Sequence, residues 1–361
     1  MWLQDCPFVL AYNKKSIIYK GRLCILISSL HKYEVKRMAR LFSIGEVLID
    51  FIPAQKGVAL KEVVSFERAP GGAPANVAAA VAKAGGQASM ITKLGEDAFG
   101  DFLIDTLNNV GVNTEYILRT KKANTALAFV SLKEDGERDF SFYRNPSADL
   151  LLSEDEISDN WFNEGDILHF CSVDLVESPM KQAHVKAIKV AKEKGALISF
   201  DPNVRLPLWE SAEECQATIR EFLPQAHLVK ISDEELEFIT GIKDEKEAIH
   251  SLFTGEVKAV IYTKGAEGAI LYVNEESFSS AGYKVTVQDT TGAGDAFIGG
   301  FLYKLIEKNA TTFNLESLLK QEHVDILSYA NASGALTTTG KGAISALPSK
   351  QEIYDFIEKQ K

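Results

Sequence analysis

Short apolar segments alternate with longer helical patterns through most of the chain, and this alternation restricts the fold more than any other feature. Strands that alternate with helices pack as a parallel sheet with helices on both faces. We therefore expect an α/β fold with a doubly wound, mostly parallel sheet flanked by helices. The segments that read as buried strands include 167–171, 196–200, 228–231 and 259–263.

The run at residues 41–51, Leu-Phe-Ser-Ile-Gly-Glu-Val-Leu-Ile-Asp-Phe, is almost wholly apolar. Such a run is typical of a strand that is buried on both faces. We expect one parallel strand here, with Asp50 at its carboxyl end, where ligands bind in open α/β sheets.

Two further strand-like segments, 125–132 and 138–143, flank an Asp-Gly pair. Asp-Gly between such segments favours a β-hairpin. Because a hairpin interrupts the strand–helix order, we expect a small antiparallel β lid beside the main sheet, formed by about 52–68 and 123–144. Arg144, at the end of the hairpin, is either a ligand contact under the lid or a solvated surface residue.

The length of 361 residues suits one large α/β core with an appendage. Residues 1–37 show neither a helical nor a strand period. We interpret them as an N-terminal extension that is dispensable or poorly ordered, and residues 38–361 as the functional domain.

Charge and cysteine content exclude several classes of protein. The formal net charge of −11 argues against a nucleic-acid-binding surface, which is usually basic. Cys6, Cys24, Cys171 and Cys215 are widely spaced, which indicates unpaired thiols in a reducing compartment. No segment is long enough to span a bilayer. We expect a cytoplasmic protein without nucleic-acid or membrane partners.

Polar residues follow several of the predicted strands. Any one of them is explained as a turn residue, but the carboxyl ends of parallel strands meet at one edge of a sheet, so together they predict a ligand site there. These residues are Asp50, Asn203 with Arg205, Ser232 with Glu235, and Thr263.

Two glycine-rich segments each lead into an apolar, helix-like stretch. In the first, Gly71-Gly72-Ala73-Pro74-Ala75-Asn76, Asn76 is either a helix cap or a ligand contact. In the second, Asp289-Thr290-Thr291-Gly292-Ala293-Gly294-Asp295, closely spaced amides would meet the positive end of a helix, which is a place that binds an anion. Asp295 beside such an anion is expected to receive or steer a proton. A simple helix cap is the alternative.

With both segments in this order, the chain resembles the ribokinase-like (PfkB family) carbohydrate kinases from about residue 41 to 348, and within them it looks most like the fructokinases. The resemblance implies phosphorylation of D-fructose at its 6-hydroxyl by ATP. It implies that Asp295 is the catalytic base and that Arg205 lies near the transferred phosphoryl group. The amides of Gly292, Ala293 and Gly294 would form the anion hole.

The resemblance also suggests which residues bind the two substrates and the ions. The sugar contacts would come from Asp50, Gly71, Gly72, Asn76, Arg144 and Asn203, with the hairpin as part of a lid. The nucleotide contacts would come from Lys230, Ser232, Thr263, Lys264, Gly265, Gly268 and Asn331. Glu235 would hold Mg²⁺ through water, and Asp289, Thr291 and Gly342 would hold a monovalent cation such as K⁺.

One position departs from the family pattern, and several readings stay open. Many relatives have Asn where this chain has Ser232, which puts a direct contact from Ser232 to the nucleotide in question.

A 2-keto-3-deoxygluconate kinase would share the scaffold, with Arg144 as partner for the sugar acid. A non-catalytic scaffold homologue has no need of Asp295. A dinucleotide dehydrogenase is excluded, since the first strand lacks the G-x-G-x-x-G turn. A homodimer formed through the lid is expected.

Overall fold

The computed structural model describes residues 37–55, 57–132 and 138–360. Residues Met38–Lys361 form one compact unit. The extension expected at residues 1–37 lies outside the described residues, apart from Arg37, and so does the turn of the predicted hairpin. None of the described helices is long and apolar enough to cross a membrane.

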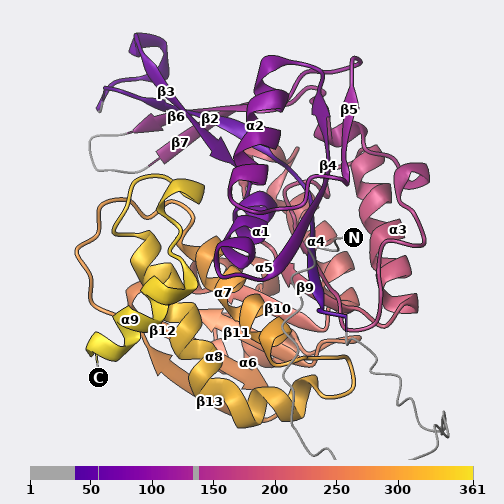
Figure 1. Cartoon of the computed structure of the whole chain (residues 1–361), viewed down its shortest axis with the longest axis vertical. Coiled ribbons are helices and arrows are strands. Elements are labelled where there is room, and N and C mark those ends of the chain that lie inside the picture. Colours follow the sequence, from indigo (N-terminus) through magenta and orange to yellow (C-terminus); the bar gives the residue numbers. More distant parts are fainter. Residues whose placement is uncertain (1–36, 56, 133–137, 361) are drawn as a thin grey trace, which may run out of the picture. The chain divides into compact units, whose positions relative to one another are not determined.

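Within the described part of the chain, a nine-stranded sheet runs through the middle of this unit (Figure 1), in the order β13-β12-β11-β10-β9-β8-β1-β4-β5. Neighbouring strands are parallel from β5 to β11, and β12 and β13 continue the sheet in antiparallel fashion. The predicted doubly wound, mostly parallel sheet is confirmed. Its strands are β1 (Arg40–Ile44), β4 (Gln87–Gly95), β5 (Ile117–Thr120), β8 (Ile167–Cys171), β9 (Leu197–Asp201), β10 (Leu228–Ser232), β11 (Ala259–Thr263), β12 (Gly268–Val273) and β13 (Glu276–Ala281).

Helices cover both faces of this sheet because successive side chains of each buried strand point to opposite faces. On β1, Leu41 belongs to one apolar core and Phe42 to the other. The first core is closed by α1 (Ala73–Lys83), α2 (Ala98–Asn109), α7 (Ala293–Glu307), α8 (Leu315–Thr337) and α9 (Lys350–Gln360). The second is closed by α3 (Pro179–Glu193), α4 (Ala212–Phe222), α5 (Asp233–Thr240) and α6 (Glu245–Ser251).

The first apolar run is not one strand, and this expectation was wrong. It divides at Gly45, where φ is +146°, into β1 in the main sheet and β2 (Leu48–Pro53) in a second, smaller sheet. A Cβ atom at position 45 would lie 2.6 Å from Cγ of Pro74, so only glycine fits this crossing without strain. Asp50 therefore lies on the smaller sheet rather than at the end of a main-sheet strand.

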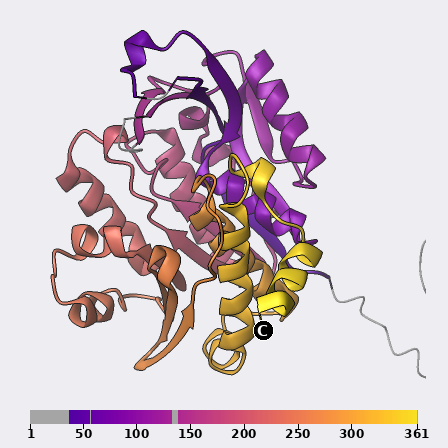
Figure 2. The same cartoon turned by 90° about the vertical axis from the view of Figure 1, so that its left-hand side faces the viewer.

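The small sheet has the order β3-β2-β6-β7, with β3 (Phe66–Gly71), β6 (Leu127–Leu132) and β7 (Arg138–Tyr143). In Figures 1 and 2 it lies at the end of the unit away from the β12–β13 hairpin. The predicted hairpin is present as β6 and β7, and β2–β3 is a second antiparallel pair. The central pair, β2–β6, is parallel, which the long connection through β3, α1, β4, α2 and β5 permits.

Candidate active site

A pocket lies between the small sheet and the carboxyl ends of the main-sheet strands. Its volume is about 1230 Å³, which exceeds the roughly 300–1,000 Å³ of ordinary small-molecule sites and leaves room for two ligands. The small sheet contributes Leu48, Asp50, Ile52, Val130 and Phe142, the strand ends contribute Asn203, Val204, Arg205, Lys230, Ser232, Glu234 and Glu235, and the glycine loops contribute Gly72, Ala73, Asn76 and every residue from Asp289 to Asp295.

The second glycine segment meets α7 as predicted. Gly292 is the N-cap of α7 with φ +74°, and a Cβ there would lie 2.6 Å from Cβ of Ala343, so this position also requires glycine. Gly292, Ala293 and Gly294 all line the pocket. The first amides of a helix have no carbonyl partner within the helix. The positive end of α7 therefore faces the pocket, as an anion site requires.

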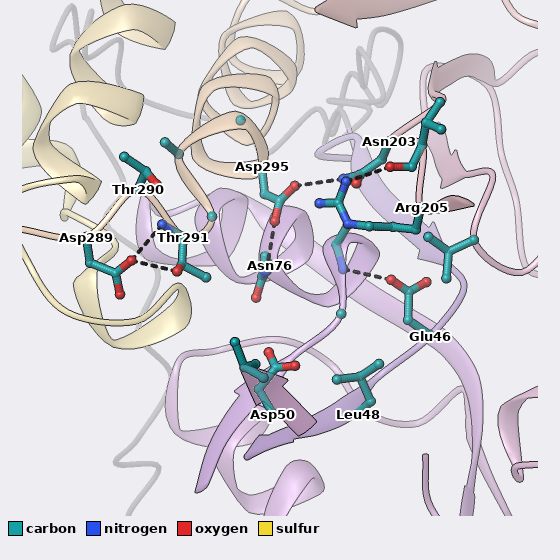
Figure 3. Close-up of a pocket in the computed structure, with 18 of the residues that line it drawn as sticks. Glu46, Leu48, Asp50, Asn76, Asn203, Arg205, Asp289, Thr290, Thr291 and Asp295 are labelled. Carbon is teal, nitrogen blue, oxygen red and sulfur yellow. Dashed lines mark hydrogen bonds between the residues drawn. The ribbon is translucent and has the colours of Figure 1, made fainter. Parts of the chain in front are cut away.

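Asp295 occupies the first turn of α7, and two amide side chains from other parts of the chain hold it (Figure 3). Asn76 Nδ2 donates to Oδ2 at 2.8 Å, and Asn203 Nδ2 lies 3.4 Å from Oδ1. Burial raises the pKa of Asp295 above its usual value, while the hydrogen bond from Asn76 and the charges of Arg205 and Lys230 oppose the rise. Asp295 is thus a stronger proton acceptor than a solvated aspartate, and its orientation is fixed.

Glu235 joins two of the strand-end loops. Its Oε1 accepts from the amide of Val204 at 2.8 Å, and its Oε2 accepts from the amide of Ser232 at 3.0 Å and from its hydroxyl at 2.8 Å. Burial opposes ionisation, but the charge of Lys230 and these donors lower the pKa of Glu235. The Ser232 hydroxyl is therefore part of the N-terminal cap of α5, while Glu235 remains an anion on the pocket wall.

Asp289, Thr291 and Gly342 come together as the predicted cation site requires, but the carboxylate already joins two loops. Asp289 Oδ1 accepts from the amide and hydroxyl of Thr291 at 3.0 and 2.6 Å, and Oδ2 accepts from the amide of Gly342 at 2.9 Å. This arrangement fixes the glycine loop against the segment that precedes Ala343.

Arg144 is 8% exposed and is not among the residues that line the pocket, so the reading as a solvated surface residue was wrong. It is buried in ion pairs with Asp149 and Asp174. Burial opposes its charge, but Asp149, Asp174 and Glu46 raise the pKa of Arg144 and keep it cationic. The ion pair with Asp174 could not be predicted from the sequence, because Asp174 belongs to a distant segment.

Several residues that we assigned to the nucleotide also lie outside the described lining. Lys264 pairs with Glu245 at 2.9 Å, and Asn331 Nδ2 donates to the Ser280 hydroxyl at 3.0 Å and to two carbonyls of β13. The residues in this group are Thr263, Lys264, Gly265, Gly268 and Asn331, and on the sugar side Gly71 is likewise absent from the lining.

Glu46 lines the pocket and was missed. Its Oε1 accepts from the amide of Ala73 at 2.9 Å, its Oε2 is buried without a hydrogen bond, and the residue is 3% exposed. Burial, reinforced by Asp174, raises the pKa of Glu46 well above the usual value, against the charge of Arg144. An isolated acid inside an otherwise apolar run was the signal that could have drawn attention to it.

The chain is similar to carbohydrate kinases along nearly its whole described length. The model of the pfkB family carbohydrate kinases matches residues 38–350. The chain is 45% identical over 319 residues to "Probable fructokinase-4" of Arabidopsis thaliana. The aligned region covers 88% of this chain and 96% of that relative.

Two solved structures have the same fold at moderate identity. A fructokinase with bound ATP from Xylella fastidiosa has a TM-score of 0.82 and 36% identity, covering 90% of this chain and 99% of that one. A fructokinase from Vibrio cholerae O395 with fructose, ADP and calcium ion bound has a TM-score of 0.79 and 36% identity, covering 89% and 99%.

The buried ion pairs of Arg144 predict a large effect on stability. Arg144→Met leaves Asp149 and Asp174 without their cation, and breaking a buried pair in this way costs about 3–5 kcal/mol in the free energy of unfolding. Urea unfolding measures this loss. The control Lys121→Met removes an exposed pair with Glu96 and should change stability by about 0.5 kcal/mol or less. Similar small losses for both variants would contradict the prediction.

Proposed function

The chain belongs to the pfkB family of carbohydrate kinases, and from this membership we propose that it transfers the terminal phosphoryl group of ATP to the 6-hydroxyl of D-fructose. The observation that carries the proposal is the setting of Asp295: a buried carboxylate, held by Asn76 and Asn203, at the positive end of α7. The Xylella relative binds ATP and the Vibrio relative binds fructose with ADP, which supports both substrates.

The proposed sugar end of the pocket combines an apolar wall with acceptors for hydroxyl groups. Leu48, Val130 and Phe142 line it together with Asp50, which faces the pocket from the small sheet (Figure 3). Carboxylates and amides that accept or donate hydrogen bonds suit the hydroxyls of a neutral sugar. Gly72, which also lines the pocket, is required by the backbone: its φ is +107°, and a Cβ there would lie 2.4 Å from the carbonyl oxygen of Glu46.

The charges around this end favour a neutral sugar over a sugar acid. Arg144, the cation that a 2-keto-3-deoxygluconate carboxylate would need under the lid, is neutralised by Asp149 and Asp174. The Asp50 carboxylate lines the same region, beside Glu46, whose raised pKa favours its neutral form. A carboxylate brought there by the substrate would meet the like charge of Asp50 and no free cation of the lid, which costs binding energy.

The proposed reaction uses few residues. The O6–H proton of fructose passes to Asp295 as the bond from O6 to the γ-phosphorus forms and the bond to the bridging oxygen of ADP breaks. Phosphoryl transfer passes through a loose transition state, so Asp295 mainly orients the hydroxyl and accepts its proton late. The amides at the start of α7, together with Arg205 and Lys230, stabilise the negative charge on the transferred group.

A divalent ion fits this site only together with the nucleotide. Among the residues that the structure describes, no group of three or more His, Cys, Asp or Glu side chains is placed to hold a metal. Mg²⁺ keeps several waters and binds one or two carboxylates plus phosphate oxygens, so we propose that Glu235 holds it through water. When bound, the ion neutralises phosphate charge.

We propose the remaining contacts on the basis of the resemblance described above. Asp289, Thr291 and Gly342 are joined to one another by hydrogen bonds, and we propose that a monovalent cation such as K⁺ binds beside them. We propose that the adenosine part of ATP extends past Ser232 towards the carboxyl edge of β11, where Thr263 is the neighbour of Ser232. The residues assigned to that part are Thr263, Lys264, Gly265, Gly268 and Asn331.

We also propose that two copies of the chain associate through the small sheet. One of its faces carries a cluster of aromatic rings: Phe51 stacks on Phe129 with ring centroids 4.8 Å apart, and Phe66 and Tyr143 pack edge-on against Phe129. Tyr143 is 62% exposed. Exposed aromatic groups on a sheet with free edges are typical of interfaces.

The substrate assignment is tested by ATP consumption with fructose, glucose, mannose, ribose and 2-keto-3-deoxygluconate. We expect the highest kcat/KM for fructose and little turnover of the sugar acid, because Asp50 repels a carboxylate and Arg144 is already neutralised by its own partners. A preference for 2-keto-3-deoxygluconate would overturn the proposed substrate.

Asp295→Asn should retain fructose and ATP binding but lower kcat by roughly 10²–10⁴-fold, the usual effect of losing a general base. The wild-type kcat/KM should fall as the pH drops through the pKa of Asp295, because only the ionised form accepts the proton. Since that pKa is raised, the acidic limb should lie above the ~3.9 of a free aspartate. Asp105→Asn, on the exposed side of α2, serves as control, and near-normal turnover by Asp295→Asn would remove Asp295 as the base.

The dimer is tested by light scattering of the full chain. We expect twice the chain mass of 39.7 kDa for the wild type and for Phe313→Glu, which changes a residue that is 90% exposed outside the small sheet. Tyr143→Glu should shift the protein towards the monomer. A monomeric wild type, or a dimer that Tyr143→Glu leaves intact, would contradict this interface.

A further inference from the structure

Lys230 and Asp201 form a buried ion pair at the floor of the pocket, on the neighbouring strands β10 and β9. Lys230 Nζ lies 3.2 Å from Oδ1 and 3.1 Å from Oδ2 of Asp201, and the side chains are 8% and 1% exposed. Lys230 lines the pocket, whereas Asp201 is not part of its described lining. The reaction outlined above assigns no task to Asp201.

The ammonium of Lys230 lies close to the loop that would hold the transferred phosphoryl group. A Cβ built on Gly294 would be 3.6 Å from Nζ. Gly294 belongs to the first turn of α7, and the residues of this turn line the pocket. The amide of Ala293 donates to the carbonyl of Thr290 at 3.2 Å, so the positive end of the helix acts here mainly through its dipole. The ammonium and the helix terminus therefore bring two sources of positive charge to one small region, which is where negative charge develops during phosphoryl transfer.

The surroundings keep Lys230 charged. Burial opposes the charge, but three carboxylates raise the pKa of Lys230. On the adjoining strand β8, burial lowers the pKa of His169 to about 3 and raises the pKa of the Cys171 thiol, so these two neighbours are neutral. The carboxylates that face the ammonium are Asp201 from β9, Glu235 from α5 and Asp295 from α7.

Of these carboxylates, Asp201 is the one that fixes the position of the ammonium. A lysine has a long, flexible stem and a compact charge, so its head stays in one place only if a partner holds it. Glu235 is engaged by Ser232 and Val204, and Asp295 by amide side chains. Asp201 contacts Nζ with both of its oxygens.

We propose that Asp201 is a positioning residue for phosphoryl transfer: it holds the Lys230 ammonium under the glycine loop, where the ammonium offsets charge on the transferred group and favours ionised Asp295. The inference rests on the proposed kinase function. A pair that served stability alone would change the unfolding temperature without a selective effect on kcat or on the pH profile.

The first variant is Asp201→Asn, which keeps the shape of the side chain and removes its charge. We expect kcat to fall roughly 10–10²-fold, less than the ~10²–10³-fold typical for loss of a direct donor. The KM for fructose should stay close to wild type because neither Asp201 nor Lys230 is among the proposed sugar contacts.

For the second variant, Lys230→Met, we measure kcat/KM as a function of pH. The charge of Lys230 lowers the pKa of Asp295 against the effect of burial, so without this cation the pKa of Asp295 rises and the base is lost at a higher pH. The acidic limb of kcat/KM should therefore move to higher pH than in the wild type. The matched control is Asp325→Asn, which removes a carboxylate 2.9 Å from another buried lysine, Lys304, away from the pocket. It should lower the unfolding temperature but leave kcat and the acidic limb unchanged.

The proposal would be overturned if Asp201→Asn kept the wild-type kcat and Lys230→Met kept the wild-type acidic limb. It would also be overturned if neither variant folded. Each variant is compared with the wild type on the best sugar from the substrate screen. A wild type that prefers another sugar would contradict the proposed substrate and still allow the pair to be tested on that sugar.

Discussion

The site depends on how closely α1 and α7 approach each other. A Cβ on Gly299 would lie 2.5 Å from Cβ of Ala80, so the two helices touch almost backbone to backbone. This contact brings Asn76, at the start of α1, within 2.8 Å of Asp295, at the start of α7. The loop assigned to the sugar and the loop assigned to the phosphate are thereby held in register by helix packing in the apolar core.

Carboxylates then fix the remaining loops to one another. Glu235 binds Val204 and Ser232, Asp289 binds the glycine loop and Gly342, and Asp97 caps α2 while accepting from the amide of Thr125, just before β6. Each of these side chains joins segments that are distant in sequence. Rigid loops cost no reorganisation when charge develops, and this preorganisation is the main source of electrostatic catalysis.

The alternation of apolar segments and helices was enough to predict the sheet, and the second glycine segment was enough to predict that Asp295 lies at the start of a helix. Both depend on local patterns. The division of the first strand at Gly45 was not predictable in this way, because its cause is Pro74, in another part of the chain. Arg144 shows the same limit: a sequence reveals a cation after a hairpin, but not the distant Asp174 that neutralises it. The β12–β13 hairpin was missed although Asn274, with φ +55°, marks its turn.

The crossing at Gly45 also bears on how relatives of this protein can diverge. Gly45 and Pro74 occupy one shared volume, and Ser43, two residues before the glycine, donates a hydrogen bond to the carbonyl of Pro74 at 2.7 Å. Loss of the proline ring would remove the clash at position 45 but not the cost of its positive φ. The two positions should therefore drift unequally over evolutionary time: position 74 can change while Gly45 stays, whereas a change at position 45 requires that position 74 has already changed.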